Sequence, residues 1–210
     1  MNPLAAFLDP LPLVAVLRGI SPEEIAAVGE ALTEHGFRVL EVPLNSPRAF
    51  DSIRLLAERW GARCLVGAGT VIAVDDVARV RAAGGRVIVM PHADVAVIRE
   101  AKAQRMLCIP GVATPTEAFA ALAAGADGLK MFPAEALPPA ALRAWRAVLP
   151  RETLVFAVGG MRPDNLGPYW DAGASGFGTG SNLYKPGAPP AAVRTVAAAF
   201  AAAVRALPPR

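Results

Sequence analysis

Side chains that usually bind metals are scarce in this chain of 210 residues, which has two histidines and two cysteines. Cys64 and Cys108 lie in separate apolar runs, and the histidines form no HxH or HExxH arrangement. A zinc-type site needs several imidazole or thiolate ligands, so the sequence supports no metal centre of this kind. Two isolated cysteines are typical of buried free thiols in a reducing compartment, and we expect a cytoplasmic protein.

Segments that would direct the chain to a membrane or to nucleic acid are also missing. Residues 1–12 show no basic stretch followed by an apolar one, so we expect no signal peptide. The alanine-rich tail from Ala191 to Leu207 is interrupted by Arg194 and Arg205, which predicts an amphipathic helix and not a membrane span. The net charge of +3 comes from scattered arginines and aromatic residues make up 6%, so nucleic acid is not an expected partner.

Short apolar runs alternate with alanine-rich stretches of helical period along the whole chain. Eight such units predict a single (β/α)8 TIM barrel over residues 1–210, with Asn2 to Asp9 as a short helix covering its lower end. The alternative is an open, doubly wound sheet. The chain shows no obvious break half-way along, which favours the closed barrel over the open sheet. The expected strands are residues 13–17, 39–42, 64–67, 87–90, 106–109, 128–131, 154–158 and 175–178.

Two of the expected helices carry start signals in the sequence. Ser21 and Thr114 are each followed by a proline and, three residues later, by a glutamate. This spacing is typical of a capping box with proline at the first helical position. We therefore expect helices to begin directly after both residues.

Lys130 is one of only three lysines in the chain, and it lies inside the apolar run from Gly128 to Met131. Arginine would hold an anion there equally well, so a lysine favours chemistry that needs a primary amine. A buried amine that has lost its proton attacks a ketone to form a Schiff base. The alternative is a lysine at a strand end whose stem is buried and whose amine reaches solvent.

Glu41 is a carboxylate between Leu40 and Val42 in another buried strand. Carboxylates are rarely buried without a partner, and burial raises their pKa towards neutrality. Glu41 is therefore a candidate for transferring protons near neutral pH. The alternative is a structural ion pair, with Arg18 as the partner.

Glycines follow the last two strands at the positions where barrels usually bind phosphate. Gly159 and Gly160 follow the seventh strand, and Gly180 and Ser181 follow the eighth. Glycine lets the backbone approach an anion closely, and the serine adds a hydroxyl donor. Occurring together, the two clusters favour a phosphorylated ligand over plain turns.

Arg18 and Thr70 follow the first and third strands, at the same end of the barrel. The forked donors of Arg18 suit a carboxylate, and the Thr70 hydroxyl can donate to a carboxylate or carbonyl. Thr70 is as well explained as the cap of the next helix. We interpret His92, after the fourth strand, as a turn residue.

Five segments are specific in combination: Leu17–Ile20, Glu41–Pro47, Gly67–Val71, Leu129–Pro133 and Phe156–Gly160. Together they resemble the class I aldolases that cleave 2-keto-3-deoxy-6-phospho-sugar acids, and the likeness covers nearly the whole chain. The resemblance implies that Lys130 is the Schiff-base lysine and Glu41 the acid/base residue. It also implies that Arg18 and Thr70 hold the pyruvate carboxylate, that no cofactor is needed, and that the protein is a homotrimer. The phosphate would be bound by Gly159, Gly160, Gly180 and Ser181.

Two branches of this family act on substrates that are epimers at C4. The gluconate branch typically has an arginine where this chain has Asn45 and a threonine where it has Val158. Both positions favour the galactonate branch, which converts 2-dehydro-3-deoxy-6-phosphogalactonate to pyruvate and D-glyceraldehyde 3-phosphate. The expected partners are these small molecules. The alternatives are the gluconate substrate, an epimerase-like barrel that uses the lysine as an electrostatic clamp, and a phosphosugar-binding barrel without activity.

Overall fold

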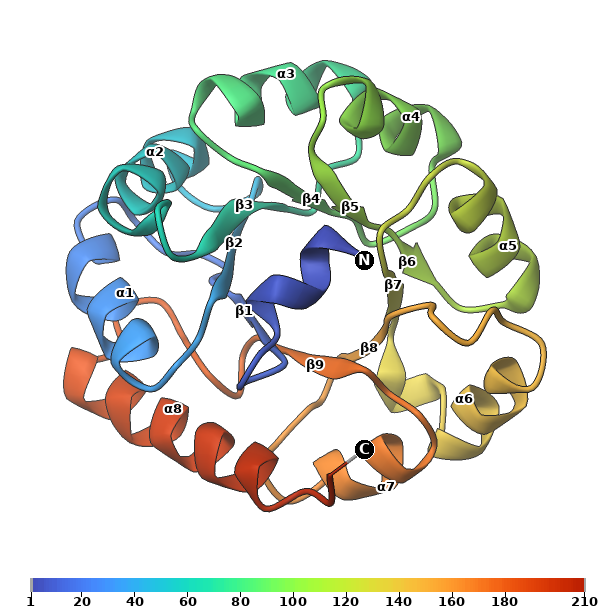
Figure 1. Ribbon diagram of the computed structural model, residues 1–210. Coiled ribbons are helices and arrows are strands. Elements are labelled where there is room, and N and C mark those ends of the chain that lie inside the picture. Colours follow the sequence, from blue (N-terminus) through green and yellow to red (C-terminus); the bar gives the residue numbers. More distant parts are fainter. Residues whose placement is uncertain (1, 210) are drawn as a thin grey trace.

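The computed structural model describes residues 2–209 as a ring of parallel strands enclosed by helices (Figure 1). Met1 and Arg210 of the expected 1–210 domain lie outside the described residues. The strands hydrogen-bond in the order β5-β4-β3-β2-β1-β9-β8-β7-β6. Their bounds are β1 Leu13–Val16, β2 Val39–Pro43, β3 Leu65–Gly69, β4 Val87–Val89, β5 Leu107–Ile109, β6 Gly111–Val112, β7 Leu129–Met131, β8 Val155–Val158 and β9 Gly176–Thr179.

β5 corresponds to the expected strand 106–109, and β6 is an additional short strand that follows it after Pro110. Proline has no N–H to donate to a ladder, so the regular pairing stops there. β5 pairs with β4, and β6 pairs with β7. The Pro110 carbonyl still accepts the Lys130 N–H at 2.8 Å, which carries the sheet across the proline. The expected (β/α)8 barrel is thus confirmed, and the open doubly wound sheet is wrong.

The helices form an outer ring around the strands (Figure 1). The alanine-rich tail folds as the amphipathic helix α8, which buries Val193 and Phe200 against the barrel. Within residues 2–209, no helix combines the length and the apolar character that a membrane crossing requires. The bounds are α1 Ile25–Glu34, α2 Ala49–Trp60, α3 Val74–Ala82, α4 Val95–Ala103, α5 Pro115–Ala123, α6 Pro139–Arg146, α7 Leu166–Asp171 and α8 Pro190–Arg205.

Of the two expected capping boxes, the structure contains one. Thr114 caps α5, its hydroxyl accepts the Glu117 N–H, and the Glu117 carboxylate accepts the Thr114 N–H. The box at Ser21 is wrong, because α1 begins only at Ile25 and residues 21–24 form a turn. The Glu24 carboxylate does accept the Ser21 N–H at 3.0 Å. Its other oxygen accepts the Tyr184 hydroxyl at 2.7 Å, so Glu24 joins the loops after β1 and β9.

Alternation along the strands decides which side chains enter the barrel. Val14 and Val39 belong to the cluster that fills the interior, whereas Leu40 and Leu129 pack beneath the helices. Position 41 lies two residues after Val39, and position 130 follows the outward-facing Leu129. The pleat therefore points both ionisable side chains into the barrel.

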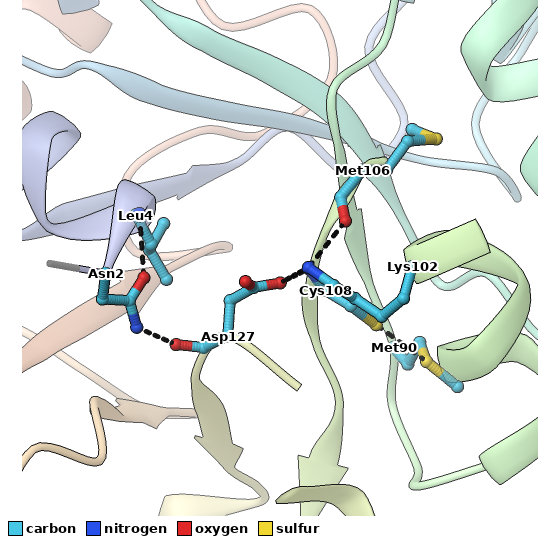
Figure 2. A network of polar contacts seen from close by, with 7 residues as sticks. All are labelled: Asn2, Leu4, Met90, Lys102, Met106, Cys108 and Asp127. Atoms are coloured by element: carbon cyan, nitrogen blue, oxygen red, sulfur yellow. Dashed lines mark hydrogen bonds and ion pairs between the residues drawn. The ribbon is translucent and has the colours of Figure 1, made fainter. Parts of the chain in front are cut away.

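The lower end of the barrel is closed by the 3-10 helix η1, Pro3–Phe7, which lies across the ring of strands in Figure 1. Leu4 is fully buried against the interior cluster. Asn2 accepts the Leu4 N–H at 2.9 Å and donates to the Asp127 carbonyl at 2.6 Å. The Asp127 carboxylate in turn accepts hydrogen bonds from the Lys102 amine and the Cys108 N–H (Figure 2). This network joins the N-terminal segment, α4, β5 and the start of β7.

We expect Asp127→Ala to lower the free energy of unfolding by about 2 to 3 kcal/mol, because it removes the ion pair with Lys102 and leaves the buried Cys108 N–H without its acceptor. Urea denaturation at neutral pH measures this change. The matched control is Asp164→Ala, which removes an exposed ion pair with Arg162 and should cost less than about 1 kcal/mol. Equal losses for the two variants would contradict a stabilising role for the network.

Candidate active site

Lys130 lies in the barrel interior near the carboxyl ends of the strands, and its side chain is 6% exposed. Below it is an apolar gap of about 10 Å³ lined by Val14, Val89, Ile109 and other interior side chains. A gap of this size and lining stays dry. The amine lies 4.5 Å from the centre of the Phe132 ring. Burial lowers the pKa of Lys130 below its ordinary value, and the positive charge of Arg18 acts in the same direction.

Glu41 projects into the same interior from β2 and is 1% exposed. Burial raises the pKa of its carboxyl to about 7, although Lys130 and Arg18 pull in the opposite direction. One carboxyl oxygen, Oε2, is buried without a hydrogen-bond partner in the described protein. This carboxyl rests on Gly69, where a Cβ would come within 1.9 Å of Oε2. An orphaned oxygen with a pKa near neutrality is suited to accept or deliver a proton.

The alternative for Glu41, an ion pair with Arg18, is not present within 4 Å among the described residues. Arg18 instead donates to Asn45 Oδ1 at 2.7 Å and to Thr70 Oγ1 at 3.2 Å. Asn45 and Thr70 therefore fix the guanidinium beside the mouth of the barrel. The two residues lie on the loops after β2 and β3.

Thr70 is not the cap of the next helix, because α3 begins at Val74 and its N-cap is Ala73. Its backbone has a φ of +54°, a left-handed conformation that is unusual for a β-branched residue. Such a conformation costs on the order of 1–3 kcal/mol and persists where the surroundings impose it. Here it turns the hydroxyl towards Arg18.

One cavity of about 170 Å³ joins the lysine to the two glycine clusters. Arg18 lines this cavity, whereas Glu41, Thr70 and Asn45 do not. Thr70 and Asn45 contact the cavity residue Arg18 through hydrogen bonds. The remaining candidates that line it are Lys130, Val158, Gly159, Gly160, Gly180 and Ser181. The structure thus brings all the expected site residues to one end of the barrel.

The same cavity contains residues that the sequence did not single out. Phe132, Met161 and Asn182 line it, as does Glu135. Glu135 lies on the 3-10 turn η2, Ala134–Ala136, directly after β7. The sequence does show an acidic residue a few positions after the lysine strand. It does not show whether the side chain of this residue points into the cavity or away from it.

The histidines and cysteines take no part in this site. His92 lies in an exposed bend after β4 and does not line the cavity, in agreement with its interpretation as a turn residue. Cys64 and Cys108 are buried free thiols, as expected. Within residues 2–209, no three His, Cys, Asp or Glu side chains are grouped so that they could hold a metal ion.

Comparisons with known proteins agree over most of the chain. Residues 4–189 match the family model described as "Aldolase: KDPG and KHG aldolase". The chain is 50% identical over 192 residues, 91% of each chain, to the probable 2-dehydro-3-deoxy-6-phosphogalactonate aldolase of Rhizobium meliloti. It is 45% identical to the 2-dehydro-3-deoxy-6-phosphogalactonate aldolase of Escherichia coli, covering 93% of this chain and 95% of the relative.

A solved structure described as "Native KDPGal structure" superposes on this chain with a TM-score of 0.92. The two sequences are 45% identical, and the match covers 93% of this chain and 95% of the other. Sequence and three-dimensional comparison therefore lead to the same group of proteins.

We expect the amine of Lys130 to titrate below 10.5 in a pH series of carbamylation by cyanate, followed by peptide mapping. Cyanate is small enough for the cavity, and only the neutral amine reacts. In Glu41→Gln the pKa of Lys130 should fall further, because the ionised Glu41 carboxylate stabilises the ammonium form. A Lys130 amine that titrates at 10.5 or above would contradict its burial.

Proposed function

Because the chain belongs to the KDPG and KHG aldolase family, we propose that it cleaves 2-dehydro-3-deoxy-6-phosphogalactonate to pyruvate and D-glyceraldehyde 3-phosphate through a Schiff base on Lys130. The observation that carries this proposal is the pair of buried groups inside the barrel. Burial lowers the pKa of Lys130 and raises that of Glu41 to about 7. A nucleophilic amine and a proton-transferring carboxyl are what the reaction needs.

The reaction begins with the neutral amine of Lys130 adding to the C2 ketone of the substrate. Loss of water then gives a protonated imine, which withdraws electrons from the C3–C4 bond. The dry, apolar lining below the lysine favours the neutral amine at the start. An arginine at this position could not take part, because its guanidinium does not lose its proton in proteins.

Glu41 acts on the C4 hydroxyl. Its carboxylate takes the hydroxyl proton through a water molecule while the C3–C4 bond breaks and its electrons move into the imine. D-Glyceraldehyde 3-phosphate leaves, the resulting enamine gains a proton at C3, and hydrolysis of the imine releases pyruvate. A pKa of about 7 lets the same carboxyl take up and return a proton near neutral pH.

The ends of the substrate have complementary partners at the barrel mouth. Arg18 and Thr70 are proposed to hold the carboxylate, since the guanidinium is already fixed by hydrogen bonds to Thr70 and Asn45. The phosphate is proposed to bind the backbone N–H groups at Gly159, Gly160 and Gly180 and the Ser181 hydroxyl. These residues share the cavity with Lys130, so one elongated substrate can reach both regions.

Preference for the galactonate epimer is supported by the names of the two relatives and by two positions of the chain. Val158 lines the cavity with Lys130, close to where C4 would lie. Asn45 contacts Arg18, so its effect on C4 would be exerted through the guanidinium. The gluconate epimer has less support, because both relatives are named for the galactonate compound. An epimerase-like barrel has less support because the matching family model is that of aldolases. A silent binding protein would need neither the buried amine nor the buried carboxyl.

The reaction needs no cofactor. We propose a cytoplasmic homotrimer: the trimer follows from the family resemblance, and the free thiols suit a reducing compartment.

We expect Lys130→Ala and Lys130→Arg to lose turnover, and wild-type protein to gain a reduced pyruvate adduct on Lys130 when mixed with pyruvate and borohydride. Glu41→Gln should still form this adduct and lose at least about a hundredfold in cleavage rate, the usual contribution of general acid–base catalysis. Intact mass, peptide mapping and a pyruvate-release assay measure these effects. Near-wild-type turnover by either Lys130 variant would refute the Schiff-base mechanism.

We expect wild-type kcat/KM to be higher on the galactonate substrate than on its gluconate epimer, and Val158→Thr to shift the ratio towards gluconate by adding a hydroxyl near C4. Both epimers yield the same products, so the rates must be compared on the two pure substrates. Val158→Ile is the matched control, since it changes volume without adding a hydrogen-bonding group. An unchanged ratio in Val158→Thr would remove Val158 from epimer selection.

A further inference from the structure

Glu135 is an acidic residue in the substrate cavity that has no role in the reaction proposed above. It lies on η2, directly after the strand that carries Lys130, and lines the cavity together with Lys130 and Ser181. Its position is therefore within the site, against the Gly159–Gly160 pair.

The side chain of Glu135 packs over the glycine pair. A Cβ at Gly159 would lie 3.0 Å from Glu135 Oε2, and a Cβ at Gly160 would lie 2.5 Å from Glu135 Cγ. Any larger residue at Gly160 would displace Glu135. The two glycines thus make room for this carboxylate as well as for an anion.

The turn that carries Glu135 is held in place from the outer ring. The Tyr169 hydroxyl of α7 is shared between the Ala134 carbonyl at 2.8 Å and the Leu137 carbonyl at 3.1 Å. The Glu135 carboxylate itself accepts no hydrogen bond from residues 2–209 and has no ion pair within 4 Å there. Tyr169 thus holds the backbone on either side of Glu135, and the exposed carboxylate has lone pairs available to a ligand.

A carboxylate beside a phosphate site weakens the binding of phosphate, because like charges repel. A neutral side chain would avoid that cost, so the acid needs a compensating hydrogen-bond donor in the ligand. The proposed substrate has two hydroxyls between the imine carbon and the phosphate. Glu41 is the proposed proton acceptor for the C4 hydroxyl. The C5 hydroxyl has no partner so far and lies next to the phosphorylated carbon.

We propose that Glu135 accepts a hydrogen bond from the C5 hydroxyl of the substrate and thereby selects for a hydroxylated phosphoaldehyde. The proposal rests on the proposed aldolase function and names a recognition element that this function leaves open. In the direction of synthesis, this hydroxyl is the 2-hydroxyl of D-glyceraldehyde 3-phosphate. The aldehyde that lacks it is 3-phosphooxypropanal.

The test compares condensation of pyruvate with these two aldehydes. We expect Glu135→Ala to lose about tenfold or more in kcat/KM with D-glyceraldehyde 3-phosphate, as for a lost hydrogen bond to a charged group. With 3-phosphooxypropanal the loss should be less than about twofold. Glu135→Gln, whose amide oxygen still accepts a hydrogen bond, should keep part of the preference. Glu152→Ala, an exposed acid in the loop before β8, is the matched charge control.

Borohydride trapping of pyruvate on Lys130 serves as the second readout and should be unchanged in the Glu135 variants, which shows that the barrel is folded. Equal losses with both aldehydes would overturn the role of Glu135 and leave the aldolase function intact. A gain in kcat/KM with both aldehydes would also overturn it, since it would show that the carboxylate only repels phosphate. Absence of condensation by the wild-type protein with either aldehyde would overturn the aldolase function itself.

Discussion

The chemistry of this protein depends on the burial of two ionisable groups within one closed sheet. Attraction between Lys130 and Glu41 would keep both groups charged, as in an ordinary ion pair. Loss of solvent is the larger effect for both, and it drives each pKa towards neutrality. The barrel imposes this loss because its parallel strands are covered by helices outside and filled by apolar side chains inside. A lysine in the same sequence context on an open sheet edge would retain its charge.

The two ends of the barrel divide stability from reactivity. At the lower end, Asp127 satisfies the Lys102 amine and the Cys108 N–H, and Asn2 and Leu4 close the interior. At the upper end, Glu41 keeps an unpaired oxygen, and Thr70 is held in a left-handed conformation. Unsatisfied groups and backbone strain are costly, and the upper end contains one of each where a ligand can use them.

The sequence was sufficient for the barrel and for its two central residues, because apolar runs identify buried strands and a charge inside such a run is conspicuous. It was insufficient where loops from distant parts of the chain meet. The spacing at Ser21 predicts a helix start, but the structure has a turn there, because Glu24 bonds to partners some 160 residues further on. The direction of Glu135 also depends on neighbouring strands and helices. Local propensity carries no information about such contacts.

The dry gap below Lys130 and the plug formed by Leu4 leave the lysine accessible from one side only. Every molecule that reaches the amine, including the water that hydrolyses the imine, must pass the same entrance. In the proposed reaction the pyruvyl part stays covalently bound to Lys130 after the C3–C4 bond breaks, whereas the aldehyde is no longer attached to the protein. Release is therefore sequential, with the aldehyde first and pyruvate last, and free pyruvate can occupy the enzyme before the aldehyde returns.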